Sequence, residues 1–383
     1  MANETRQLAE YAAAVRYADL PAPVVQRAKD VIADTIATIL FGHDLPWSRM
    51  IIAYAEGMGT RGKARILGPG RGAVRAPLAA LANGTLAHAF ELDNLTWPNS
   101  GVHPGATMLV PALAVAQERG IGGRELIAAF VAGAETMIRI GRATKHNNES
   151  RGFHAPGTTG PFGAAIAVGR LMRLNAEKMT NAIGIAGSLA GGLLEFARSG
   201  TGAMVKRLHL GRAAESGVMA ASLASEGFTG PRSVLEGPFG YLNVFCGEHD
   251  LAALTNGLGA EYATLRIMLK RFPCHITAHT SVQAIEDMRA EHNYSGDDVA
   301  AINIAGTEKM ATINNIPKPA DLMLAQYSIP FCVALAHYKN PRDPRSFNSK
   351  AVTDPARPAS SRDTPISPSF LNWGSALSRI RAV

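Results

Sequence analysis

Two kinds of residue are scarce in this chain of 383 residues, and each scarcity excludes a class of protein. Cysteine occurs only three times, at Cys246, Cys274 and Cys332. Such spacing excludes a disulfide framework and a cysteine-rich zinc or iron–sulfur site. Aromatic residues make up 6% of the chain and do not alternate with basic residues, so no groove for nucleic acid is expected.

Long apolar runs are also missing. Apolar runs such as "VIADTIATILFG" and "LIAAFVAGAETMIRIG" are interrupted by Asp34 and Glu135 and are too short to span a bilayer. The first twenty residues have mixed charge and lack the apolar segment of a secretory signal. We therefore expect a cytoplasmic protein without a membrane partner.

The net charge of +7 is unevenly distributed. Residues 339–383 contain eight Lys and Arg residues against three Asp residues, so this segment supplies +5 of the total. The rest of the chain is nearly neutral. Because binding to nucleic acid depends on a continuous basic surface, we expect no nucleic-acid partner.

Hydrophobic residues are abundant at 47%, and they recur mainly at helical spacing. After Pro21 and Pro23, apolar positions follow a period of 3.6 residues until Gly42, which predicts a helix. Similar patterns predict helices at about 47–57, 75–92, 104–119, 123–143, 159–173, 176–196 and 210–226. The fold class is therefore mainly α, with a large all-helical domain over residues 1–250.

The pattern changes after residue 260. The segments "ATLRIMLKRFP" and "VAAINIAGTEKM" have the β-branched alternation of strands, and "TSVQAIEDMRAEH" between them is typical of an amphipathic helix. They predict a smaller α+β domain over 251–356. Residues 357–383 are rich in Pro, Ser and Arg, a composition that predicts an atypical, poorly ordered tail.

Titratable residues gather in "HAFELDNLTWPNSGVHPGA", residues 88–106. If the helix continues to residue 92, His88 and Glu91 lie on one face of it. Asp93 then falls at the helix end, and His103 precedes the next helix. Alternatively, Asp93 or Asn94 only organises a turn and His103 is an interior histidine.

A glycine-rich stretch, "RGFHAPGTTGPFGAAIAVGR" at 151–170, begins with His154. The predicted loop at 157–160, which includes Thr158, offers backbone N–H groups that could hold an anion. The alternative is a tight helix crossing that requires glycine. No Gly-Lys-Ser/Thr sequence follows and no strand precedes, so nucleotide binding is not expected.

Two further stretches combine cations with histidines. In "GAMVKRLHLGRAAESG", Lys206, Arg207, His209 and Arg212 fall within seven residues, although Gly211 makes a continuous helix doubtful and a solvated face is the alternative. In the second stretch, "LKRFPCHITAHT", the candidates are Lys270, Arg271, His275 and His279. This histidine pair lacks the glutamate and third ligand of a zinc site, so no metal is expected. Cys274 is interpreted as a buried small side chain.

Histidines, a few carboxylates and several cations suit proton chemistry on a small polycarboxylate. Removal of a proton next to a carboxylate builds negative charge, which requires a base together with cations or N–H donors. Histidine can act as acid or base near neutral pH.

Five ordered segments resemble the MmgE/PrpD family, and the resemblance covers roughly residues 5–355. They are "HAFELDN…HPGA", "GFHAPGTTGPFGAA", "KRLHLGRAAESGVMAASLASEGFTGP", "KRFPCHITAH" and "LMLAQYSIPFCVALA". The resemblance implies an all-helical domain with a smaller α+β lid domain, a homodimer, and a cofactor-free site in the cleft between the domains.

The resemblance also implies a set of site residues. The catalytic ones are Asp93, His103, His154, Lys206, His275, His279 and Tyr327, and those that bind substrate are Arg207, Lys270, Arg271 and Thr158. By hypothesis, His103 and His154 transfer protons and Asp93 orients or accepts. Lys206, together with Lys270 or Arg271, holds the substrate carboxylates. Many members of the family have an Asp-rich stretch where this chain has "FELDN", which predicts a different local charge.

Members of this family include 2-methylcitrate dehydratase, cis-aconitate decarboxylase and iminodisuccinate epimerase. We expect a metal-independent lyase that dehydrates a 2-methylcitrate-like hydroxy-tricarboxylate by abstracting a proton next to a carboxylate. Decarboxylation and epimerisation are alternatives, because they pass through a similar carbanion. A different alternative is a truncated homologue without catalytic activity.

Overall fold

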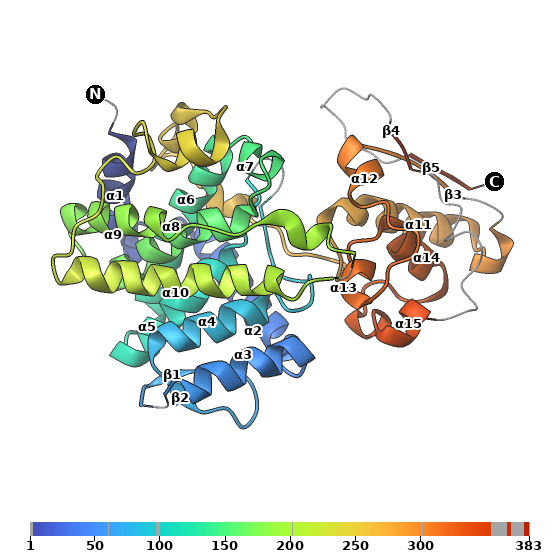
Figure 1. The fold of residues 1–383 in the computed structure, drawn as a ribbon, viewed down its shortest axis with the longest axis horizontal. Coiled ribbons are helices and arrows are strands. Elements are labelled where there is room, and N and C mark those ends of the chain that lie inside the picture. Colours follow the sequence, from blue (N-terminus) through green and yellow to red (C-terminus); the bar gives the residue numbers. More distant parts are fainter. Residues whose placement is uncertain are drawn as a thin grey trace. The chain divides into compact units, whose positions relative to one another are not determined.

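The computed structural model describes residues 3–59, 61–96, 100–200, 202–299, 302–353, 366–368 and 379–382. The chain forms two compact units, which are described separately: Met1–Leu194 with Met204–Leu269, and Glu195–Ala203 with Lys270–Val383. The sequence predicted a boundary near residue 250, whereas residues 251–269 lie in the first unit. The mainly α fold is confirmed (Figure 1). Among the described helices, none is both long enough and apolar enough to cross a membrane.

The first unit is built from helices joined by short connections. They are α1 (Glu4–Ala14), α2 (Ala22–Gly42), α3 (Pro46–Gly57), α4 (Ala76–Ala87), α5 (Val110–Arg119), α6 (Gly123–Ala143), α7 (Asn147–Ser150), α8 (Ala155–Leu171), α9 (Ala176–Ser188) and α10 (Val205–Ser225). The strands β1 (Ala64–Arg65) and β2 (Ala73–Val74) form an antiparallel pair between α3 and α4. A wide helical turn, Gly105–Leu109, leads into α5.

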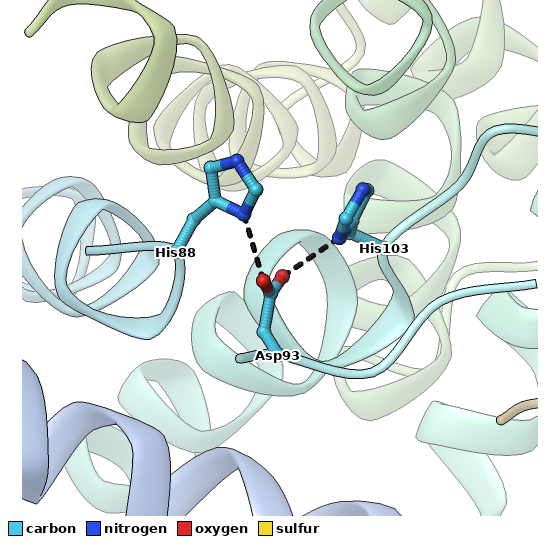
Figure 2. A group of neighbouring side chains, drawn as sticks. All are labelled: His88, Asp93 and His103. Atoms are coloured by element: carbon cyan, nitrogen blue, oxygen red, sulfur yellow. Dashed lines mark hydrogen bonds and ion pairs between the residues drawn. The ribbon is translucent and has the colours of Figure 1, made fainter. Parts of the chain in front are cut away.

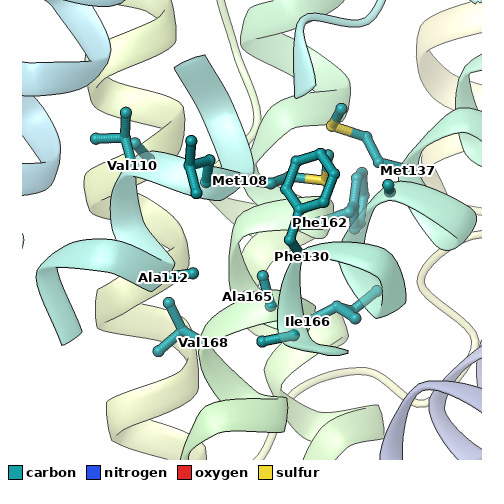
Figure 3. Packing of buried hydrophobic residues seen from close by; sticks show 14 of the residues in the cluster. Met108, Val110, Ala112, Phe130, Met137, Phe162, Ala165, Ile166 and Val168 are labelled. Carbon is teal, nitrogen blue, oxygen red and sulfur yellow. The ribbon is translucent and has the colours of Figure 1, made fainter. Parts of the chain in front are cut away.

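Helix α8 forms the centre of this unit, and every one of its residues is buried. It packs against α6, α9 and α10, and its Phe162 lies in one buried cluster with side chains such as Met108 and Phe130 (Figure 3). The loop predicted at 157–160 is wrong, because these residues belong to α8. The alternative prediction, a tight helix crossing, is confirmed: a Cβ atom on Gly160 would lie 2.8 Å from the Cβ of Ala213.

Because α8 and α10 cross closely, one added methyl group at the crossing is predicted to lower the stability of the protein. A Cβ atom on Gly217 would lie 2.1 Å from the Cβ of Ala164, so Gly217→Ala should lower the free energy of unfolding by about 1–3 kcal/mol. Gly57→Ala is the control, because its Cβ meets no atom within 4 Å, and it should raise stability by about 0.5–1 kcal/mol. Urea unfolding measures both. Equal stability of the two variants would contradict this packing.

The second unit combines short helices with a three-stranded sheet. Its elements are α11 (His279–His292), β3 (Ile302–Gly306), α12 (Glu308–Thr312), α13 (Leu322–Ala325), α14 (Ile329–Tyr338), α15 (Ser349–Thr353), β4 (Ile366–Pro368) and β5 (Arg379–Ala382). Strand β3 pairs with β4 in parallel and with β5 in antiparallel orientation. Helix α11 packs on α14.

The sequence predicted the α11 helix and the β3 strand correctly. The strand predicted at 263–273 is wrong, because Ala263–Arg266 forms a 3₁₀ turn in the first unit. Of the tail 357–383, which we expected to be poorly ordered, only residues 366–368 and 379–382 are described, and they form β4 and β5. The other residues of this tail lie outside the described part of the chain.

A buried histidine, His337 in α14, makes the second unit sensitive to acid. Its side chain is 4% exposed, and its ring centre lies 5.7 Å from that of Tyr294. Burial, together with the nearby positive charge of Arg289, lowers the pKa of His337 to about 4. The unfolded chain therefore binds a proton at His337 below about pH 6.5, while the folded chain resists it until about pH 4.

Stability should accordingly fall as the pH drops from about 6.5 to about 4. In His337→Phe this proton uptake is absent, so the acid-unfolding midpoint should move to lower pH. His292→Phe, at an exposed position of α11, is the control. Circular dichroism at stepwise lower pH measures the midpoint. A midpoint unchanged by His337→Phe would contradict the role of this histidine.

Candidate active site

The first candidate segment begins where α4 ends. The sequence predicted this helix to continue to residue 92, but it ends at Ala87, so His88 and Glu91 do not share a helical face. The Ala89 carbonyl oxygen leaves the helical pattern and accepts hydrogen bonds from Trp47 Nε1 and Arg207 Nε, each at 3.1 Å. Glu91 follows with φ of 54°, in the left-handed region that few residues other than glycine adopt.

Asn94 holds the two ends of the next loop together. Its Nδ2 donates to Asp34 Oδ2 at 2.9 Å and to Thr35 Oγ1 at 3.0 Å, and its Oδ1 accepts from the Gly105 N–H at 2.8 Å. A Cβ atom on Gly105 would lie 2.0 Å from Thr35 Oγ1, so only glycine fits there. The turn-organising role considered for Asn94 is confirmed, and the result is that Asp93 and His103 lie side by side.

Asp93 accepts hydrogen bonds from two imidazoles, as Figure 2 shows. Its Oδ1 lies 2.8 Å from His88 Nδ1, and its Oδ2 lies 2.8 Å from His103 Nδ1. Asp93 and His88 are fully buried, while the side chain of His103 is 12% exposed. Because an ionised carboxylate has no hydrogen to donate, both histidines must carry their hydrogen on Nδ1. The Nε2 atom of His103 is therefore the ring nitrogen that Asp93 does not use.

The charges in this trio depend strongly on one another. Burial alone would raise the pKa of Asp93, but the two imidazoles lower it well below its ordinary value. Burial also lowers the pKa of His88 well below its ordinary value, and this effect exceeds the opposing attraction of Asp93. The nearby Lys206 ammonium adds to the lowering for His88. Asp93 is thus a fixed anion inside the protein.

Lys206 reaches the same cluster from α10. The sequence predicted this helix from about residue 210 and made a continuous helix across Gly211 doubtful. In the structure α10 begins at Val205 and runs through Gly211. Gly211 is needed for close packing, since its Cβ would lie 2.3 Å from the Leu81 carbonyl oxygen. Lys206 Nζ contacts Glu91 Oε1, and the same Oε1 lies 3.3 Å from His88 Nε2.

A second histidine pair lies next to Lys206 along α10. His154, which precedes α8, places its Nδ1 3.0 Å from the Nδ1 of His209. Burial lowers the pKa of His209, and the Lys206 ammonium lowers it further. With a neutral His209, one ring must donate and the other accept across the 3.0 Å contact.

The residues predicted to bind substrate in this unit are both buried. The Arg207 guanidinium lies 4.6 Å from the centre of the Trp47 ring and its Nε bonds to the Ala89 carbonyl, so it supports the end of α4. Thr158 Oγ1 donates to the Ala155 carbonyl at 3.1 Å and lies 2.9 Å from the Tyr241 hydroxyl. Contact of Thr158 with substrate remains a prediction, whereas for Arg207 these contacts favour a structural role, which is tested below.

The remaining candidates belong to the second unit. The rings of His275 and Tyr327 lie 4.5 Å apart, while His279 lies beside Phe272 and its Nε2 is 3.3 Å from the Cys274 carbonyl oxygen. Lys270 is largely buried and Arg271 is exposed. Cys274 is fully buried, as predicted. The catalytic and substrate-binding roles of Lys270, Arg271, His275, His279 and Tyr327 remain predictions.

The trio of His88, Asp93 and His103 could be considered as metal ligands, because one donor atom of each lies within 4.8 Å of the others. However, the two nitrogen–oxygen distances of 2.8 Å are those of hydrogen bonds, and each oxygen of Asp93 is used by one imidazole. A metal would have to replace both hydrogens. We therefore interpret the trio as an acid–base group.

Three residues that lie close to Asp93, Lys206 or His154 were absent from the predicted site: His88, Glu91 and His209. The signal was present, since His88 is three residues before Glu91 and His209 is three residues after Lys206. Sequence spacing could not show that Glu91 meets Lys206, because the two residues belong to distant segments.

These observations define a class of protein that is mainly helical, has two units, and contains a buried group of histidines and carboxylates. The chain belongs to the MmgE/PrpD family: residues 6–254 match the MmgE/PrpD N-terminal domain and residues 272–360 match the MmgE/PrpD C-terminal domain.

Several curated proteins are similar to this chain. A cis-aconitate decarboxylase-like protein of Aspergillus oryzae is 31% identical, over 76% of this chain and 62% of the relative. The cis-aconitate decarboxylase of Aspergillus terreus is 30% identical, over 75% and 60% of the two chains. The human cis-aconitate decarboxylase is also 30% identical, over 70% and 55%. The chain thus spans about three fifths of the length of the curated relatives it matches.

The placement of Arg207 predicts that it stabilises the fold rather than binding substrate. Arg207→Lys retains the charge but loses the Nε hydrogen bond and the flat contact with Trp47. We expect the melting temperature to fall by about 2–4 °C for each kcal/mol lost. The affinity for a tricarboxylate, measured by calorimetry, should change less than about threefold. An affinity loss of tenfold or more at an unchanged melting temperature would instead assign Arg207 to substrate.

Proposed function

We propose that this protein is a lyase that acts on a small polycarboxylate by proton transfer at a carbon next to a carboxylate. The observation that carries the proposal is the buried Asp93, which fixes the orientation and hydrogen position of His88 and His103. An imidazole with its Nδ1 held by a carboxylate can take or give a proton at Nε2, which is the usual arrangement of a general acid or base.

Cis-aconitate-type decarboxylation is the reaction we favour, because the similar curated proteins are named for it. In this reaction a carbon–carbon bond to one carboxylate breaks and CO₂ leaves. The electron pair remains on the substrate and spreads through its double bond toward another carboxylate. His103, which has first taken up a proton from solvent at Nε2, gives this proton to the carbon and forms the new carbon–hydrogen bond. His103 thereby returns to its neutral form, with its Nδ1 hydrogen still bonded to Asp93.

Dehydration of a 2-methylcitrate-like substrate, which the sequence predicted, uses similar chemistry in the opposite order. A base removes the proton next to a carboxylate, and an acid protonates the leaving hydroxyl. The His154–His209 pair, with one shared hydrogen across 3.0 Å, could serve as the second proton-transfer group. The dehydration remains a prediction and is tested in the same experiment.

We also propose a homodimer in the cytoplasm that needs no cofactor. The family resemblance supports the dimer and the cofactor-free reaction, and the low cysteine content supports the compartment. Sedimentation analysis tests the dimer directly: a single species with the mass of one chain would contradict it.

The test of the proposed reaction is incubation with cis-aconitate, 2-methylcitrate, citrate and iminodisuccinate in deuterated water, with products identified by NMR. We expect cis-aconitate to lose CO₂ and the product to carry one deuterium at the protonated carbon. His103→Asn should lower turnover by about 10²- to 10⁴-fold, the usual contribution of a general acid or base.

His292→Asn is the matched control, because this exposed histidine of α11 should leave turnover unchanged. Faster turnover of 2-methylcitrate than of cis-aconitate would favour the dehydratase. Turnover of none of the four compounds by the folded protein would favour the homologue without catalytic activity. Full activity of His103→Asn would remove His103 from the mechanism.

A further inference from the structure

The sequence predicted that Lys206 holds a carboxylate of the substrate, but in the structure this lysine already contacts a carboxylate of its own chain. Lys206 Nζ contacts Glu91 Oε1, and the two residues are 4% and 2% exposed. An ion pair this deeply buried is strongly coupled, because little water screens the charges.

Glu91 adopts a backbone conformation that must be stabilised by its surroundings. Its φ of 54° is costly for a residue with a side chain, and such conformations persist where neighbouring contacts enforce them. Here the end of α4 is fixed by Trp47 and Arg207 through the Ala89 carbonyl, two residues before Glu91. The fold thus directs the Glu91 carboxylate toward Lys206 from a rigid support.

The charges around this pair leave little uncompensated positive charge in the cluster. Lys206 faces Glu91, and Asp93 faces His88 and His103. Arg207, the next cation on α10, bonds to the Ala89 carbonyl and lies over the Trp47 ring, which are both neutral. The two cations Lys206 and Arg207 are therefore balanced in number by the two carboxylates Glu91 and Asp93. Each carboxylate of an incoming substrate therefore meets the attraction of Lys206 and the repulsion of Glu91 together.

We propose that Glu91 is a specificity-determining residue that offsets the charge of Lys206 and so disfavours substrates with additional carboxylates. The inference rests on the proposed action on polycarboxylates, and it assigns to Glu91 the selection among them by number of carboxylates. The size of the effect follows from Coulomb's law. For a separation of about 8 Å between the Glu91 carboxylate and a substrate carboxylate, the charge of Glu91 changes the affinity for the substrate roughly fivefold at an effective dielectric constant of about 40, and roughly thirtyfold at about 20. The effect should therefore increase with each carboxylate on the ligand.

The test compares two ligands that differ by one carboxylate, propane-1,2,3-tricarboxylate and pentanedioate. Calorimetry measures their affinities for the wild-type protein, Glu91→Gln and the control Glu118→Gln. Glu118 accepts from the Ala76 N–H at the opposite end of α4, and a helix of 12 residues is about 18 Å long. We expect Glu91→Gln to bind both ligands more tightly and to raise the preference for the tricarboxylate about fivefold or more. Glu118→Gln should leave this preference unchanged.

Glu91→Gln leaves Lys206 buried without its counter-charge, which can destabilise the protein. A double variant, Glu91→Gln with Lys206→Met, removes both charges together and tests the same inference. Its affinity for the tricarboxylate should remain within about threefold of the wild type, whereas Lys206→Met alone should bind it at least fivefold more weakly.

Several results would overturn the inference. They are an unchanged tricarboxylate preference in Glu91→Gln, weaker binding of both ligands by that variant, and a tenfold loss of affinity in the double variant. Absence of binding to both the wild type and Glu91→Gln would also overturn it. These measurements need no turnover, so a protein that binds the ligands as expected but converts no substrate would contradict only the proposed function.

Discussion

A carboxylate inside a protein stays ionised only when donors replace the water it has lost, and Asp93 meets this constraint with two imidazole N–H groups. The consequence reaches beyond Asp93 itself. Because both Nδ1 hydrogens are committed to one carboxylate, the hydrogen positions of His88 and His103 are fixed before any ligand binds. The acid–base chemistry proposed for His103 depends on this fixed arrangement.

The packing of the helices in the first unit brings these imidazole donors to Asp93. Close packing of α8, α10 and α4 relies on glycine, and Gly211 lets α10 approach α4 near Thr85. That approach places Lys206 beside Glu91 and His209 beside His154. Glycines that are required for packing therefore also determine which titratable groups meet. The same packing keeps Glu91 and Lys206 away from water, which makes their mutual charge important for ligand choice.

Much of the fold could be predicted from periodicity alone. The helices α2 and α6 are long and amphipathic with clear stops, so their predicted and observed ends nearly agree. Helix α4 is apolar on all sides and has no local stop signal, so its end at Ala87 was missed. That end is set by Trp47 and Arg207, which are distant in the sequence. The glycines at 157–160 suggested a loop, because their role in helix crossing depends on a partner helix.

The candidate site was predictable in its residue types but not in its pairings. Asp93 and His103 belong to one short stretch, and the residues that follow them closely, Asn94 and Gly105, carried the signal. The contact between Glu91 and Lys206 depends on the placement of α10, which no local pattern reports. The prediction that Lys206 holds a substrate carboxylate took account of the charge of Lys206 but not of the Glu91 carboxylate that contacts it. Which charged groups form pairs could therefore be determined only from the folded chain.

The hydrogen positions on His88 and His103 provide the most direct measurement. A long-range ¹H–¹⁵N NMR spectrum of protein labelled at histidine distinguishes a protonated Nδ1 from a bare one in each ring. With an ionised Asp93 between them, both rings should show a protonated Nδ1, and both signals should change in Asp93→Asn. A bare Nδ1 on either His88 or His103 in the folded protein would contradict the arrangement from which the chemistry was derived.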